Sequence, residues 1–81
     1  MVDIQQQLND LLDTLRQAYD SSTEWLEALD GHIFYFVTKP THNAKDMKLL
    51  DYLLEESNKV KDLRQNISNV IDEVEDQINS I

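Results

Sequence analysis

The two histidines of this 81-residue chain are side chains that could bind a metal ion. His32 follows an apolar stretch, and His42 lies close to Pro40 in a segment rich in turn formers. Together with Asp46 they would supply three ligands, but the sequence has neither an H-x-x-x-H nor an E-x-x-H spacing. We therefore interpret both histidines as structural residues, and we expect no metal and no cofactor.

Carboxylates near the C-terminus are the second group with chemical potential. Asp72 and Asp76 are four residues apart and Asp72 and Glu75 are three apart, so each pair would share one face of a helix. Paired carboxylates work as general acids and bases only in a pocket that shifts their pKa values. The outer side of a thin helical rod offers no such pocket. The sequence therefore predicts a solvated acidic face and no enzyme.

The composition favours a small, acidic, all-α protein. One glycine and one proline leave little material for the frequent turns of a β-rich fold. Sixteen acidic against seven basic residues give a net charge of −9, which disfavours binding to nucleic acids and to anionic membranes and favours a basic partner. Cysteine is absent and the N-terminal segment does not resemble a signal peptide, so we expect a cytoplasmic protein.

Apolar residues in the first half predict one amphipathic helix over about residues 2–37. They follow a heptad pattern at positions a, d and e, which is wide enough for a helical bundle. The a and d rows are Ile4, Leu8, Leu11, Leu15, Ala18, Ser22, Trp25, Leu29, His32 and Phe36, and the e row is Leu12, Tyr19, Leu26 and Ile33. The alternative is a kink or break near Ser21–Ser22, because Ser21 and Glu24 match a capping box.

A turn is expected over about residues 38–44, followed by a second helix over about residues 45–80. Pro40 disfavours helix at Lys39, and Thr41 or Asn43 can cap the next helix. The a and d rows of the second helix are Leu49, Leu53, Val60, Leu63, Ile67, Val70, Val74 and Ile81, with Glu56 and Gln77 as polar exceptions, and the e row includes Leu50, Ile71 and Ile78.

Two helices of nearly equal length joined by a short turn form an antiparallel hairpin, which makes the whole chain one helical domain. In such a hairpin Trp25 of the first helix would face Ser57 of the second, and Glu56 would accept a hydrogen bond from the Trp25 indole N–H. Two helices cannot cover two such wide apolar faces, so we predict a homodimer that forms a four-helix bundle, or else a heteromeric helical partner. The apolar residues expected to meet the partner are Phe34, Tyr35, Val37, Met47, Leu50, Leu54, Ile71 and Ile78.

Charge is distributed unevenly along the predicted hairpin. Residues 1–15 and 65–81 together carry seven acidic residues and no basic residue, whereas three lysines and Asp46 leave the turn with a charge of +2. The acidic residues expected to attract a basic partner are Asp72, Glu73, Glu75 and Asp76. The simpler interpretation is a solvated face that keeps the protein soluble.

The segment Lys39–Pro40 with Asn43, together with RQNISN at residues 64–69, resembles type III secretion needle subunits. That family implies a helical hairpin with a proline-containing turn and a long C-terminal helix that packs in a helical assembly, but the second turn proline is missing here. The chain is also similar in size and shape to type VII secretion substrates, although LDG at residues 29–31 lacks the tryptophan of their W-x-G turn.

Three classes of function follow from these observations. The first is a non-enzymatic interaction module that acts as an adaptor, regulator or assembly subunit. The second is an acidic inhibitor or antitoxin-like protein that masks a basic, nucleic-acid-binding site. A secretion-apparatus subunit or chaperone is the alternative that the two resemblances imply.

Overall fold

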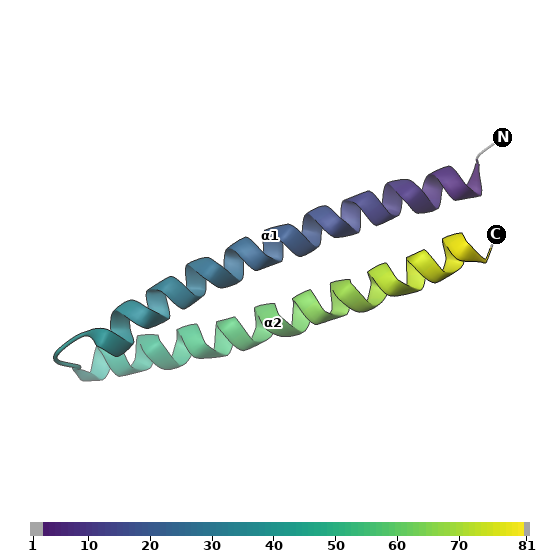
Figure 1. Cartoon of the computed structure of the whole chain (residues 1–81). Coiled ribbons are helices and arrows are strands. Elements are labelled where there is room, and N and C mark those ends of the chain that lie inside the picture. The colour runs from purple at the N-terminus through teal and green to yellow at the C-terminus, as the bar shows by residue number, and fades with distance from the viewer. Residues whose placement is uncertain (1–2, 81) are drawn as a thin grey trace.

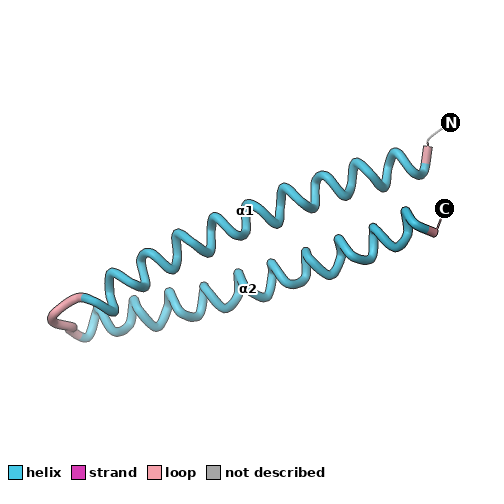
Figure 2. The backbone as a smooth tube through the Cα atoms, in the orientation of Figure 1, coloured by secondary structure: helices cyan, strands magenta, loops and turns pink. Residues whose placement is uncertain are grey.

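The computed structural model describes residues 3–80, which form a hairpin of two long helices (Figure 1). Helix α1 spans Ile4–Thr38 and helix α2 spans Ala44–Asn79. A single short loop joins them, and the two chain ends lie at the same end of the hairpin (Figure 2). The Cα atoms extend over 62 × 17 × 14 Å, so the molecule is a rod only one helix thick. The predicted all-α antiparallel hairpin is confirmed.

Helix α1 runs without interruption through Asp20–Thr23, where the sequence also allowed a second helix to begin. The Ser22 hydroxyl donates a hydrogen bond to the Tyr19 carbonyl at 2.6 Å, and the Thr23 hydroxyl donates to the same carbonyl at 3.1 Å. Hydroxyls that bond back to the preceding turn remain inside a helix instead of capping a new one. The alternative of a break near Ser21–Ser22 is therefore wrong.

The turn is held by reciprocal capping of α2. Asn43 Oδ1 accepts a hydrogen bond from the Asp46 backbone N–H at 2.9 Å, and Asp46 Oδ2 accepts one from the Asn43 backbone N–H at 3.1 Å. This capping box satisfies donors that the first helical turn leaves free. Lys39, which ends α1 in an extended conformation, donates its Nζ to Asp46 Oδ2 at 2.8 Å. Asn43 was one of the two predicted caps.

The two helices pack along one seam, which we define by residues that alternate at spacings of four and three. All of them are buried or half-buried, as coiled-coil packing requires. The seam residues of α1 are Leu8, Leu12, Leu15, Tyr19, Ser22, Leu26, Leu29, Ile33 and Phe36. Those of α2 are Leu50, Leu53, Ser57, Val60, Arg64, Ile67, Ile71, Val74 and Ile78. The seam thus uses two of the three apolar rows that the sequence shows in each helix.

Small side chains occupy the middle of the seam. Ser22 and Ser57 are each 3% exposed, and Val60 is 2% exposed. Short side chains at facing positions allow two helices to approach closely. Trp25, which the sequence placed in the seam opposite Ser57, is instead 52% exposed, so its predicted burial there is wrong. Glu56 accepts a hydrogen bond from Lys59 Nζ at 3.1 Å.

Candidate protein interaction surface

The hairpin has two flanks, one on each side of the plane that contains both helix axes. A two-fold axis normal to this plane relates one antiparallel helix to the other. A residue of α1 and a residue of α2 that hold the same position in the heptad repeat therefore lie on the same flank. Residues one position before Leu12, Leu26, Leu50 and Ile71 therefore share one flank. Residues four positions after the same seam residues lie on the other flank. A helical turn takes 3.6 residues, so a step of one residue back and a step of four residues forward rotate the side chain to opposite sides of the seam.

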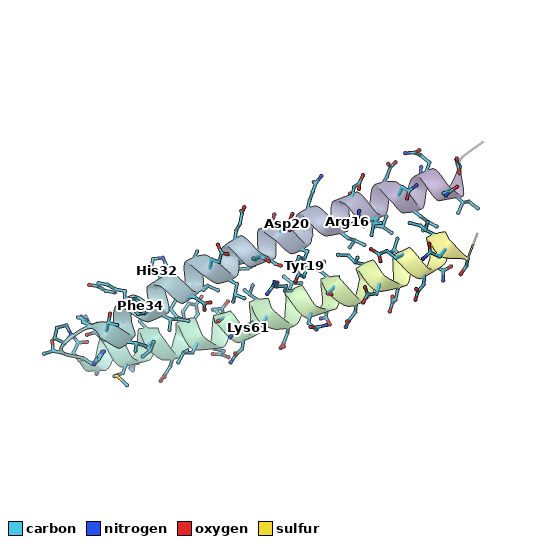
Figure 3. The ribbon with its side chains drawn as sticks, in the orientation of Figure 1. Arg16, Tyr19, Asp20, His32, Phe34 and Lys61 are labelled. Atoms are coloured by element: carbon cyan, nitrogen blue, oxygen red, sulfur yellow. The ribbon has the colours of Figure 1, made fainter. Side chains whose placement is uncertain are left out.

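An ion pair across the seam agrees with this assignment. Arg16 Nη2 lies 3.3 Å from Glu75 Oε1, and each residue follows a seam residue by four positions. A shallow hollow on the same flank is lined by Lys61 and Ser68, which follow Ser57 and Arg64 by four positions. Figure 3 shows Arg16, Tyr19 and Lys61 on neighbouring stretches of the two helices.

We call this side the polar flank. Its members in the described chain are Asn9, Arg16, Thr23, Asp30, Lys61, Ser68 and Glu75, with Val37, Met47 and Leu54 at its turn end.

The opposite side, which we call the apolar flank, exposes large apolar side chains along the length of the rod. Its large apolar members are Ile4, Leu11 and Trp25 of α1 and Leu49, Leu63 and Val70 of α2. Each is at least 39% exposed. Ala18, His32, Glu56 and Gln77 complete the two rows. A mainly apolar strip with a polar strip on the other side is the pattern of a surface that packs against another protein.

The apolar residues predicted to meet a partner fall into two groups. Exposed members lie near the turn, and they are Phe34, Tyr35, Val37, Met47 and Leu54. The remaining three, Leu50, Ile71 and Ile78, lie in the seam, where α1 covers one side of each. Tyr52 near the turn is 56% exposed and was not singled out from the sequence.

Sequence reasoning placed Leu11, Trp25, Leu63 and Val70 in the a and d rows of a stripe too wide for two helices to cover, without saying which row stays uncovered. Their exposure places them on the candidate surface. A signal for this existed in the sequence, because each helix carries three apolar rows and a two-helix seam needs only two.

The acidic residues predicted to attract a partner lie at the end of α2 that carries the chain terminus. Asp72, Glu73 and Asp76 are exposed, and Glu75 is half-buried beside Arg16. Asp3, which accepts hydrogen bonds from the backbone N–H groups of Gln5 and Gln6, caps the neighbouring start of α1. The two acidic segments therefore meet at one end of the rod, as the predicted charge distribution requires.

Charge at the turn end is partly neutralised by the Lys39–Asp46 pair. The hydrogen bond from Lys39 and the backbone N–H of Asn43 hold the pKa of Asp46 below its usual value of 3.8. The same hydrogen bond to Asp46 raises the pKa of Lys39 above its usual value of 10.5. Lys45 and Lys48 are exposed nearby, so the turn end remains positive overall.

The histidines do not form a site for chemistry in residues 3–80. The His42 ring bonds through Nε2 to the Phe36 carbonyl, which requires a protonated Nε2 and ties the turn to α1. His32 is exposed on α1 and points outward in Figure 3. No three His, Cys, Asp or Glu side chains in this described range gather closely enough to hold a metal ion. Neither of the two described helices contains an apolar stretch long enough to cross a bilayer.

Comparisons with other proteins leave the surface as the main guide to function. Comparison of the chain with protein-family models, with curated proteins and with solved structures finds no match.

Proposed function

We propose that this chain is a non-enzymatic protein–protein interaction module, which acts as an adaptor, regulator or assembly subunit by packing helices against its apolar flank. The exposed strip that runs through Leu11, Trp25 and Leu63 is the observation that carries this proposal. Apolar side chains on a surface of this length lose contact with water only when another protein covers them. The absence of cysteine fits a reducing compartment such as the cytoplasm.

The exposed area of the hairpin supports the same proposal. Its solvent-accessible surface is 6165 Å², whereas a compact monomer of 9.5 kDa exposes about 5,000 Å². The excess of roughly 1,100 Å² exceeds the ~800 Å² that each partner buries in a standard interface. A second copy of the chain is the first partner to expect, because most soluble oligomers are symmetric homomers.

Sedimentation equilibrium over a wide range of protein concentration tests this function. We expect a molecular mass twice the 9.5 kDa of the single chain, with dissociation only on strong dilution. Raising the salt concentration should not weaken the dimer, because apolar burial drives it and salt screens the repulsion between two chains of charge −9. A single-chain mass at every concentration would contradict self-association and would leave a different helical protein as the partner.

A second candidate function is supported by the acidic end of the rod. Seven carboxylates gather there without a basic residue in the same two segments, which suits a protein that masks a basic, nucleic-acid-binding site. Replacing Asp72, Glu73, Glu75 and Asp76 with Asn or Gln together tests this. Binding to a basic protein through this end should weaken steeply with salt and be lost in the variant, whereas the dimer should persist.

A further inference from the structure

We infer that the apolar flank is the interface between two copies of this chain, which pack face to face with antiparallel long axes. This inference rests on the proposed self-association. The product is a closed four-helix bundle. In this arrangement each apolar flank is covered by the same flank of the other copy, and both polar flanks remain in water.

The centre of the apolar flank carries its largest side chain. Trp25 lies four residues beyond the midpoint of α1, which corresponds to about 6 Å along the rod. Leu63 lies within two residues of the midpoint of α2. Leu11 and Val70 follow toward the chain ends, and Leu49 follows toward the turn. Interfaces between proteins concentrate their binding energy in aromatic and other large residues near the centre, so this distribution suits a two-fold axis close to Trp25.

The dimensions of the flank match those of a stable interface. A face of 62 by 17 Å covers about 1,000 Å², which is close to the area that one partner contributes to a standard protein–protein interface. Each chain has one such face, and a face that pairs with its own copy closes the assembly at two chains. The apolar flank carries one carboxylate, Glu56, which is paired with Lys59 at 3.1 Å. The polar flank is less suited to the same role, because it would bury Arg16, Glu75 and Lys61.

The charge distribution selects the antiparallel orientation. A parallel pair would place two acidic ends side by side, each with seven carboxylates. An antiparallel pair places each acidic end beside the turn of the other copy, where Lys39, Lys45 and Lys48 outnumber Asp46. Like charges repel and opposite charges attract most strongly at short range, so the second arrangement has the lower electrostatic energy.

A matched pair of substitutions tests the choice of flank. Leu63→Glu introduces a carboxylate on the apolar flank, and Leu54→Glu introduces the same carboxylate on the opposite side. The two leucines are 45% and 44% exposed, so the cost to the isolated hairpin should be nearly equal. We expect Leu63→Glu to raise the dissociation constant of the dimer by roughly 100-fold or more, because it buries an unpaired charge, and Leu54→Glu to change it by less than about threefold.

Circular dichroism should be used to check that each variant remains helical. Should Leu63→Glu lose helix, Leu49→Glu provides a second test on the apolar flank, since Leu49 is also 44% exposed. A dimer that survives both substitutions but dissociates with Leu54→Glu would overturn the choice of flank while leaving self-association intact. An unsubstituted protein that is monomeric at every concentration would overturn both this interface and the self-association on which it rests.

A distance between spin labels tests the orientation. The chain has no cysteine, so Gln7→Cys on the exposed side of α1 provides a single labelling site. In an antiparallel dimer the two labels lie about 45–55 Å apart, because Gln7 is about 21 Å along the rod from the midpoint of α1 and about 27 Å from Trp25. In a parallel dimer they lie across the width of the bundle, below about 30 Å. The shorter distance would overturn the antiparallel arrangement, and a mass that grows without limit would overturn the closed dimer.

Discussion

The guanidinium carbon of Arg64 lies 4.7 Å from the centre of the Tyr19 ring, which places a positive charge over an aromatic face inside the seam. Arg64 Nε is buried and has no hydrogen-bond partner among the described residues. A buried donor without an acceptor costs free energy, and the attraction between the charge and the ring offsets part of that cost. This pair is the one place in the seam where an ionised side chain takes a core position.

A double-mutant cycle should measure the attraction between these two residues. Tyr19→Leu and Arg64→Met, made singly and together, are expected to show a coupling of about 1 kcal/mol in the free energy of unfolding. Tyr19→Phe keeps the ring face and serves as the control, so its coupling to Arg64→Met should be close to zero. Chemical denaturation at one fixed protein concentration supplies the values. Additive single effects would show that the two groups merely lie close together.

Val60 should be the most sensitive single position in the seam. It is 2% exposed, and Val60→Ala removes two methyl groups from a site that cannot collapse without moving a helix. We expect the free energy of unfolding to fall by about 2 kcal/mol. Val37→Ala is the matched control, since Val37 is 58% exposed and should lose less than about 0.5 kcal/mol. Equal losses at both sites would contradict the described seam.

Gly31→Ala should stabilise the hairpin. Gly31 lies within α1, and a Cβ added there would have no atom within 4 Å outside the neighbouring helical backbone. Alanine has the higher helix propensity, so the substitution should raise the free energy of unfolding by about 0.5–1 kcal/mol. A rise in the midpoint of thermal unfolding would confirm it. A fall would indicate that α1 ends or bends at this residue.

Acid should weaken the turn through Asp46. Its pKa is lowered in the folded chain, so its contribution to stability is fully present above the usual value of 3.8 and is lost as the pH falls through the lower folded value. The pKa of Lys39 is raised, so its contribution is present below 10.5 and is lost as the pH rises through the higher folded value.

Urea unfolding between pH 6 and pH 2 tests the acid limb. The difference in the free energy of unfolding between the wild type and Asp46→Asn should narrow as the pH falls. Protonation of Asp46 removes the negative charge from the wild type, and the substitution has already removed it from the variant. Lys39→Met removes the principal partner of Asp46 and should flatten the same limb in part. A difference that stays constant with pH would contradict the role of the ion pair.

The helices and the turn could be predicted from the sequence because their signals are local. Pro40 and Asn43 mark the end of one helix and the start of the next by their backbone chemistry alone. The unbroken phase of apolar residues also favoured a continuous first helix through Ser22, and the structure agrees.

The choice of seam could not be predicted in the same way. Each helix has three adjacent apolar rows, and any two neighbouring rows would satisfy the spacing of a seam. Hydrophobicity favoured Trp25 as a core residue, yet the structure buries Ser22 and Ser57 and leaves Trp25 exposed. Close packing between backbones depends on both helices at once, and a single helix does not reveal it.

The regular alternation of four and three along the seam also restricts how the length of this protein can change. One residue inserted within a helix rotates everything beyond it by about 100°, which would exchange buried and exposed faces over the rest of that arm. Removing seven residues from each arm leaves both faces aligned and shortens the rod by about 10 Å. Natural length variants of this hairpin should therefore differ by multiples of seven within the arms, and freely only in the loop.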